Sequence, residues 1–426
     1  MYRSQNINTM KYKILFFQFV LYTAFSANAQ KLNLENIFSE IQQQHPAMKM
    51  YDADIMAMDE AAKGARSWMP TDFSSGFYQT PYNVNKWKAD MGQPGMGMFM
   101  VSAQQMFPNK QKQETEAKYM NAMSSVEKEK KNATLNDLYA EAKKNYYQWI
   151  IIEKKISILQ QNQKILNMML ENAEIRYRNG MEKLSSYYKA KAALGSLQNM
   201  KVMLDNDAVQ KKIVLNTLMN RNKKTEFEID STDYAIKNYT GLVVDSSTFI
   251  STRSDLKAID RAINLTYLKQ DAEKAKLKPE FGIRYDHMFA WAQQPWQFSI
   301  MGMVKIPLFN ASQKMFKATI ESLKWKAVSL SQQKQMIVNE ATGISYGILK
   351  EIEVKKKQLK LYEENIIPAL RKNFQAIQLG YQQNTEELFM LYDAWETLNM
   401  TQLEYTDQLG QLLAMQTELE KVLEKK

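Results

Sequence analysis

Histidine and methionine are the side chains of this sequence that could bind a transition metal through nitrogen or sulfur, because the chain contains no cysteine. The two histidines, His45 and His287, lie far apart in the sequence and cannot form a histidine-based zinc site by themselves. The lack of cysteine also excludes disulfides, thiolate metal sites and a cysteine nucleophile. No serine–histidine–aspartate arrangement is indicated. We therefore predict no catalytic residues, no cofactor and no resident metal site, and we do not expect an enzyme.

Methionine offers softer chemistry and is abundant, with 28 residues in the chain. Several methionines gather around one predicted strand: Met91, Met96, Met98, Met100 and Met106. Thioether sulfur suits monovalent copper or silver. Methionine is also a flexible filler of apolar cores. Metal transport and simple packing therefore both stay open for these residues.

The N-terminus predicts export. Residues 10–13 are basic, and residues 14–25 form an apolar run of about a dozen residues, which is too short to span a bilayer. The sequence Ala-Asn-Ala over 27–29 then provides the small-residue pattern of a cleavage site. We predict a signal peptide over residues 1–29 and a mature start at Gln30, with Met1 and Met10 both open as the first residue. Without cysteine, we expect no lipid anchor on that residue type.

The formal net charge is +10, but lysine and glutamate alternate along much of the chain. A run such as KEKKNATLNDLYAEAKKNYY mixes the two signs instead of forming a block of positive charge. Such mixing is typical of a solvated helix face and not of a nucleic-acid interface. We expect no nucleic-acid partner.

Two long segments that are poor in glycine and proline, roughly 110–220 and 311–425, predict helices. Apolar residues recur at seven-residue intervals in the first segment, in two series that start at Leu135 and Leu138. A heptad repeat of this length indicates helices that pack lengthwise as a coiled coil. Some 65 helical residues would extend on the order of 100 Å, which is too long for an ordinary globular core. The wall of a tube or a filamentous scaffold fits that length.

Glycine and proline gather in two windows, between Pro70 and Pro108 and between Pro279 and Pro307. Each window contains two runs in which residue types alternate, which predicts four strands per chain. The runs are about ten residues long, the length of a tilted strand that crosses a bilayer. Tryptophans lie at or near the ends of these runs, where an aromatic girdle would be: Trp68, Trp87, Trp291 and Trp296.

Four strands cannot close a transmembrane barrel, because such barrels begin at eight strands and an open sheet edge is not tolerated in lipid. A trimer would supply twelve strands around a lumen that can conduct, whereas a dimer would supply eight strands around a filled interior. We predict a mainly α-helical chain with a small β element that assembles as a homotrimer in a membrane.

The two halves of the chain repeat. Five residues of the first half recur as the same residue types 204 positions later. They correspond, in order, as follows: Tyr177, Leu184, Tyr188, Ala190 and Leu194 match Tyr381, Leu388, Tyr392, Ala394 and Leu398. We predict a first structural repeat over residues 30–220, a linker or equatorial segment over 221–252, and a second repeat over 253–426.

The order of short motifs resembles the TolC family of outer-membrane efflux proteins across essentially the whole mature chain. Leu32 and Leu34 precede a predicted short helix that ends in His-Pro at positions 45–46. The second strand ends in QQMFP over 104–108, and the fourth ends in IPLFN over 306–310. The helical turnarounds add two further motifs, RYRNG over 176–180 and GYQQN over 380–384.

The resemblance implies a trimer with a 12-stranded outer-membrane β-barrel and a long periplasmic α-helical barrel, in contact with outer-membrane lipid. The turnarounds would form the periplasmic tip, which meets a periplasmic adaptor (a membrane fusion protein) coupled to an inner-membrane pump of the RND type. The implied function is passive conduction to the exterior. The QMFP ending of the second strand is similar to that of members found with heavy-metal pumps, which favours copper or silver as cargo. General drug efflux, type I protein secretion and a periplasmic coiled-coil scaffold stay open as alternatives.

The resemblance also implies gate residues. Family members often carry two aspartates one helical turn apart at the closed end, and the matching positions are Met390 and Asp393, of which only the second is acidic. Tyr381 matches a tyrosine that helps to hold the tip closed, while the nearby family arginine falls on Glu386. Lys189, the first-repeat match of Asp393, could pair with that carboxylate. The candidates for adaptor contact lie in the two turnarounds: Arg176, Tyr177, Gly180, Lys183, Asn384 and Thr385. Ordinary helix packing of the tyrosines and a plain solvated charge at Asp393 stay open.

Overall fold

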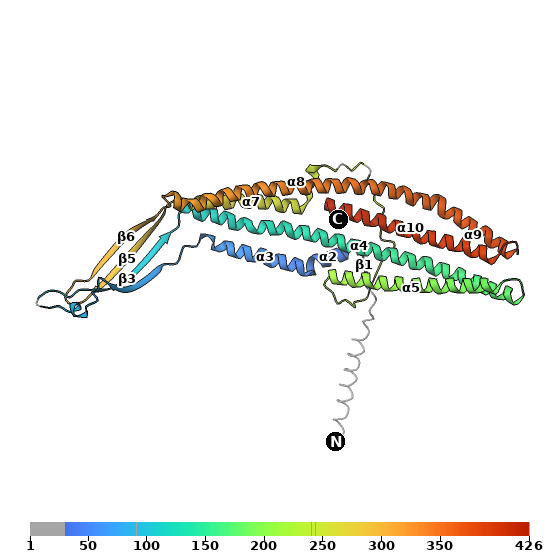
Figure 1. Ribbon diagram of the computed structural model, residues 1–426, viewed down its shortest axis with the longest axis horizontal. Helices are drawn as coiled ribbons and strands as arrows, with labels where there is room; N and C mark the ends of the chain where they lie inside the picture. Colours follow the sequence, from blue (N-terminus) through green and yellow to red (C-terminus); the bar gives the residue numbers. More distant parts are fainter. Residues whose placement is uncertain (1–29, 91, 240, 243, 426) are drawn as a thin grey trace, which may run out of the picture.

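The computed structural model describes residues 30–90, 92–239, 241–242 and 244–425. The predicted signal peptide over residues 1–29, and Met91, lie outside the described residues. The described chain is elongated, with a sheet at one end and long helices along its length (Figure 1). At the opposite end, which we call the tip, two short turns each connect one helix to the next.

The first long helix, α4 (Lys110–Arg178), is 69 residues long and contains neither glycine nor proline. At 1.5 Å per residue it extends about 100 Å. Asn109 caps its N-terminus by accepting a hydrogen bond from the backbone N–H of Lys112 at 2.7 Å. After the turn at its far end, α5 (Leu184–Leu218) runs back alongside it (Figure 1).

The matching helix of the second half is interrupted, although the sequence predicts one long helical segment there. It consists of α8 (Asn310–Leu361), a π-helical turn (Tyr362–Ile366) and α9 (Ile367–Gln382), and α10 (Leu388–Leu423) returns from the tip. Pro368 lies in the first turn of α9. Its ring cannot donate a hydrogen bond and would clash with a carbonyl one turn earlier, so a wider π turn just before it relieves both problems.

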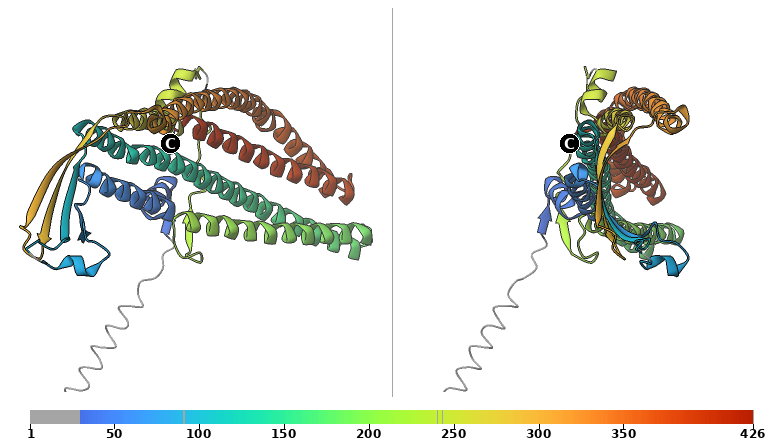
Figure 2. Two further views of the ribbon diagram at one scale, coloured as in Figure 1. Left: turned by 60° about the vertical axis from the view of Figure 1, so that its left-hand side comes forward. Right: turned by 90° about the vertical axis from the view of Figure 1, so that its left-hand side faces the viewer.

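Each long helix is accompanied by two shorter helices placed one after the other (Figures 1 and 2). Toward the sheet, α3 (Pro46–Lys63) lies along α4, and α7 (Ser254–Ala275) packs against both α4 and α8. Toward the tip, α5 and α10 take these places. The remaining elements lie near the middle of the molecule: α2 (Leu34–Gln44), α6 (Ser246–Thr252), and the parallel pair β1 (Gln30–Leu32) and β4 (Phe227–Ile229).

The four predicted strands are confirmed and form one antiparallel sheet in the order β2-β3-β5-β6. Their bounds are β2 (Asp72–Tyr78), β3 (Met98–Phe107), β5 (Glu280–Ala290) and β6 (Gln297–Lys305). Strand β2, with seven residues, is shorter than the predicted runs of about ten residues, because Gln79 takes a positive φ of 48° and Pro81 lies two residues further on. Both features end a regular strand.

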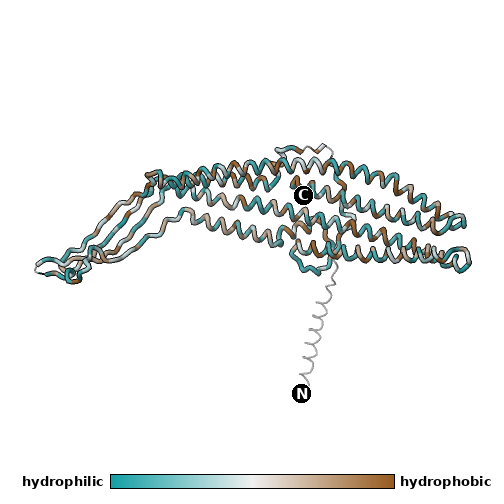
Figure 3. The backbone as a smooth tube through the Cα atoms, in the orientation of Figure 1, coloured by the Kyte–Doolittle hydropathy of each residue, from teal (hydrophilic) through white to brown (hydrophobic). Residues whose placement is uncertain are grey.

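Two apolar cores hold the helices together. One core lies around the middle of α4, where Tyr146 and Ile150 are fully buried together with Phe227 of β4 and Phe249 of α6. The other joins the tip halves of α4, α5 and α10 through residues such as Leu166. Apolar and polar residues alternate along the helices in between (Figure 3). None of the helices in the described part of the chain combines the length and apolar character that a membrane crossing requires.

The middle core also contains a buried ion pair. The ammonium group of Lys143 on α4 contacts the carboxylate of Glu420 on α10, and the two side chains are 8% and 5% exposed. Lys237 lies 2.6 Å from the same carboxylate, and the Tyr239 hydroxyl donates to it at 3.0 Å. Burial alone would raise the pKa of Glu420, but hydrogen bonds from Lys143 and Lys237 outweigh it and hold the pKa below its ordinary value. The prediction that this lysine-rich run is a solvated face is therefore wrong at Lys143.

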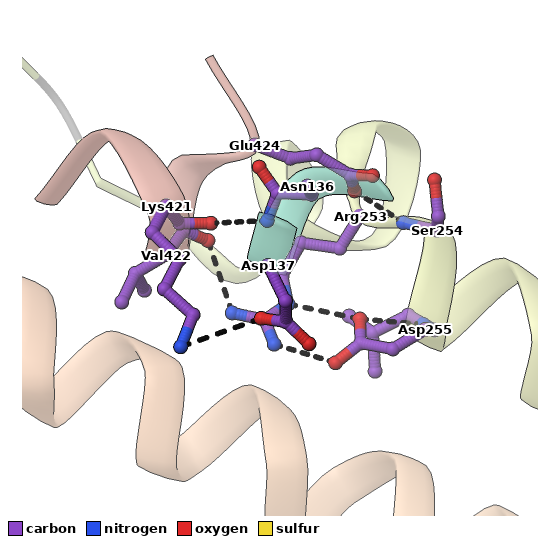
Figure 4. A network of polar contacts seen from close by, with 9 residues as sticks. Asn136, Asp137, Arg253, Ser254, Asp255, Lys421, Val422 and Glu424 are labelled. Atoms are coloured by element: carbon purple, nitrogen blue, oxygen red, sulfur yellow. Dashed lines mark hydrogen bonds and ion pairs between the residues drawn. The ribbon is translucent and has the colours of Figure 1, made fainter. Parts of the chain in front are cut away.

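A second polar network holds the end of α10 (Figure 4). Arg253, just before α7, binds Asp255 through two nitrogens and donates to the backbone carbonyl of Val422 at 3.0 Å. Asn136 of α4 donates to the carbonyl of Lys421 at 2.9 Å. These carbonyls belong to the last turn of α10, where the usual partner four residues further along the helix is missing. The Lys421 carbonyl also accepts from the backbone N–H of Glu424 at 3.1 Å. The network thus caps the helix and joins it to α4 and α7.

Candidate functional site

The two helical turns at the tip have the same local geometry. Gly180 follows α4 with φ +70°, and Asn384 follows α9 with φ +63°. A backbone N–H then reaches back to the helix in each turn, from Met181 to the carbonyl of Arg176 and from Thr385 to that of Gly380, both at 2.9 Å. Glycine and asparagine are the residues that most readily take this left-handed conformation at the end of a helix.

Arg176 connects the two turns. Its guanidinium Nη2 donates to the backbone carbonyl of Tyr381 at 2.6 Å, and the guanidinium carbon lies 4.1 Å from the centre of the Tyr381 ring. One side chain therefore makes a charge-assisted hydrogen bond and a cation–π contact with the same residue. The sequence motifs named both residues but did not predict that they touch.

Tyr381 is buried, with 3% of its surface exposed. Burial raises the pKa of its hydroxyl, which the Arg176 charge opposes in part. The hydroxyl has no hydrogen-bond partner among the residues that the structure describes. Its repeat partner Tyr177 is 43% exposed. Within the chain, the ring and backbone of Tyr381 therefore make the contacts that join the turns, and the hydroxyl does not.

The other tip candidates line the open pocket between the turns. Glu386 packs over Gly380, where its Cγ lies 2.6 Å from the place that a Cβ would take. Thr385 donates to the Gly380 carbonyl at 3.0 Å. Lys183 and Glu182 line the opposite side of the pocket. The pocket thus has carboxylates on both sides and a cluster of exposed polar groups.

Met390 and Asp393 lie one turn apart on α10, and both are exposed. Lys189 does not pair with Asp393 within the chain, a pairing that the sequence left open. Its ammonium nitrogen lies 3.8 Å from the centre of the Phe389 ring and 4.4 Å from that of Tyr392. Two aromatic faces attract the cation more directly than a carboxylate that points into solvent.

The sheet at the other end has two chemically different faces, because its register places alternate residues together. One face is apolar and aromatic: Phe73, Phe77, Phe99, Val101, Phe281, Ile283, Tyr285, Phe289, Phe298, Ile300 and Val304. The other face is polar around Asp286, which accepts hydrogen bonds from Ser102, Arg284 and Ser299. No group of three or more histidine, aspartate or glutamate side chains in the described chain is placed to hold a metal ion.

Residues 37–221 match the family model of outer membrane efflux proteins. No curated protein matches the chain in sequence at a significant level. Solved structures match its fold over nearly the whole length. The outer-membrane channel OprN has a TM-score of 0.74 at 13% identity, with 92% of this chain and 90% of that chain covered. CusC has a TM-score of 0.75 at 12% identity, with 95% and 96% covered. The outer membrane protein VceC of Vibrio cholerae has a TM-score of 0.70 at 14% identity, with 92% and 95% covered.

Proposed function

Because residues 37–221 match the family model of outer membrane efflux proteins, we propose that the chain is the outer-membrane channel of a tripartite efflux system. It passively conducts substrate from a periplasmic adaptor and an inner-membrane pump of the RND type to the exterior. After removal of the signal peptide, the chain lies in the outer membrane, and its long helices extend into the periplasm.

The four-stranded sheet carries this proposal. Its outer strands, β2 and β6, each have one edge that pairs with no other strand of the described chain. One face of the sheet is apolar and exposed, so it suits lipid, and the other is polar, so it suits an aqueous lumen. Edges in lipid must be paired, which requires further copies of the chain. Three copies give the twelve-stranded barrel that conducts, and a periplasmic scaffold would leave the apolar face in water.

The first test is assembly and conduction of the full chain. Native mass spectrometry in mild detergent should show a trimer, and the reconstituted protein should give single-channel currents in a planar bilayer. A stable monomer that gives no current would contradict the channel.

The tip is the proposed gate and the proposed contact for the adaptor. The link from Arg176 to Tyr381 fixes the two turns of one chain relative to each other. The exposed residues Lys183, Asn384 and Thr385 present polar groups at the end of the molecule, where an adaptor can reach them. Asp393 supplies an exposed charge that three copies would repeat around a constriction.

We expect Asp393→Ala to lower the preference for cations over anions in planar-bilayer recordings. Three carboxylates around an axis attract cations, while they repel one another by about 1 kcal/mol per pair at 4 Å in water. Because Lys189 contacts aromatic rings, it does not mask this charge within the chain. Asp207→Ala, at an exposed aspartate of α5, serves as the matched control. Equal selectivity in both variants and the wild type would make Asp393 a plain solvated residue.

We propose heavy-metal cations such as copper or silver as the substrate. Met100 and Met288 pair across β3 and β5 on the polar face of the sheet. They support this substrate, because thioether sulfur binds soft monovalent cations. A strain that lacks the protein should become sensitive to silver and copper. Sensitivity to organic drugs alone would favour general drug efflux. Loss of a secreted protein alone would favour type I protein secretion.

A further inference from the structure

All six methionines of the four strands lie on the same face of the sheet. The register pairs Met100 with Met288 and places Met106 and Met303 on either side of Gly282. Met98 and Met301 lie on this face as well, because each is an even number of positions from one of these residues along its strand. The apolar face contains no methionine.

This distribution does not fit the use of methionine as a packing filler. A filler belongs among apolar side chains. Here the methionines avoid the face rich in phenylalanine and isoleucine, and they share the polar face with Gln104, Arg284 and Asp286. The polar face is the one that would line an aqueous lumen.

Gly282 brings two of the thioethers together. A Cβ at this glycine would lie 2.3 Å from the sulfur of Met106 and 3.0 Å from the terminal methyl carbon of Met303. The two side chains come from the strands on either side of β5 and occupy the space above the glycine. Any larger residue at position 282 would push the sulfur of Met106 away.

We propose that Met106 and Met303, converging over Gly282, form a binding site for a soft monovalent cation such as Ag(I) or Cu(I) on the lumen face of the sheet. The site rests on the proposed channel function, because that function makes this face a lumen. Soft thioether ligands select monovalent copper and silver over the hard cations of the medium. Two neutral sulfur atoms would leave the ion free to move on, as conduction requires.

The other methionines extend the site along the strand. Met288, opposite Met100, lies six residues from Gly282 on β5, which corresponds to about 20 Å. Met301 lies between these levels, opposite Arg284. The sheet thus offers thioethers near its helical end, in its middle and near its far end. Gly282 lies close to the start of β5, which follows the end of α7, so a cation that leaves the helical part of the molecule would meet this pair first.

Silver binding to the purified full chain tests the site. We expect the double variant Met106→Leu/Met303→Leu to bind Ag(I) at least about tenfold more weakly in a chloride-free titration. Loss of a residue that only supports a metal ligand typically weakens metal binding by about tenfold or more, and loss of the ligands themselves should weaken it at least as much. Leucine keeps the volume of methionine, so the fold should tolerate the change. Met168→Leu/Met203→Leu, at two exposed methionines of the helices, removes as many thioethers and should leave the affinity unchanged.

A third variant tests whether the placement of the thioethers matters apart from their number. Gly282→Ala keeps every thioether but displaces the sulfur of Met106, so it should also weaken Ag(I) binding. NMR spectra of the protein labelled with ¹³C at the methionine methyl groups should show Ag(I)-induced chemical-shift changes for Met106 and Met303. Equal affinity in the sheet double variant and the helix control would overturn the site, even where the protein conducts. Methionine-dependent binding by a protein that gives no current would uphold the site and refute the channel.

Discussion

Replacing Glu420 with alanine is expected to destabilise the protein by about 3–5 kcal/mol, because the change leaves the charge of Lys143 buried without a partner. Both side chains are almost inaccessible to water, and the carboxylate also binds Lys237 and the hydroxyl of Tyr239. Its loss would release the segment around Tyr239 from the helices. Thermal unfolding followed by circular dichroism should show a lower midpoint, and limited proteolysis should cut the segment after β4.

A double variant separates the ion pair from general disruption of the core. Lys143→Met/Glu420→Met replaces both charges with apolar groups, and such replacements of a buried pair are often neutral or stabilising. We expect it to recover most of the stability lost in Glu420→Ala. A single variant as stable as the wild type would show that water reaches Lys143, contrary to its burial in the structure.

The same pair gives the wild type a dependence on acid. The pKa of Glu420 is held below its ordinary value in the folded state. The stabilisation is therefore complete above the ordinary carboxylate pKa of about 4.3 and is lost as the pH falls through the lowered folded value. Above that range, the difference in stability between the wild type and Lys143→Met/Glu420→Met should not change with pH, and below it the wild type should lose stability relative to that variant.

The regular elements could be predicted because each leaves a period in the sequence. Alternation over β3 and β5, and heptads over α4, reflect contacts that repeat along one face. The burial of Lys143 produces no periodic pattern in the sequence. Helix α4 is covered by α3, α5, α7 and α10 along its length, so it has more than one buried face. A heptad pattern identifies a single seam, and a lysine on a second covered face looks the same in sequence as one in water.

The internal repeat predicted the tip only in part. It correctly matched the turn at Gly180 with the turn at Asn384, because both helix ends need a residue that accepts a positive φ. It also matched Tyr177 with Tyr381, although one is exposed and the other buried. Arg176 and Tyr381 are 205 positions apart. Their contact depends on how the two halves pack, which no local pattern contains.

Replacing Arg176 with alanine is expected to increase the open probability of the reconstituted channel. The side chain gives the tip one charge-assisted hydrogen bond and one cation–π contact, which together are worth about 2 kcal/mol at a partly exposed site. If the closed tip depends on this link, its loss shifts the equilibrium toward the open state by roughly 30-fold. Single-channel recording in planar bilayers measures that shift directly, through longer and more frequent openings.

Tyr381→Phe is the matched control for this prediction. It keeps the ring and the backbone carbonyl that Arg176 contacts, and it removes only a hydroxyl that has no partner in the described chain. We therefore expect wild-type gating from it, and intermediate gating from Arg176→Lys, which keeps the charge but loses the planar guanidinium. If Tyr381→Phe opens the channel as much as Arg176→Ala does, the hydroxyl must hold the gate through a neighbouring subunit. The contact between the two turns of one chain would then not be the lock.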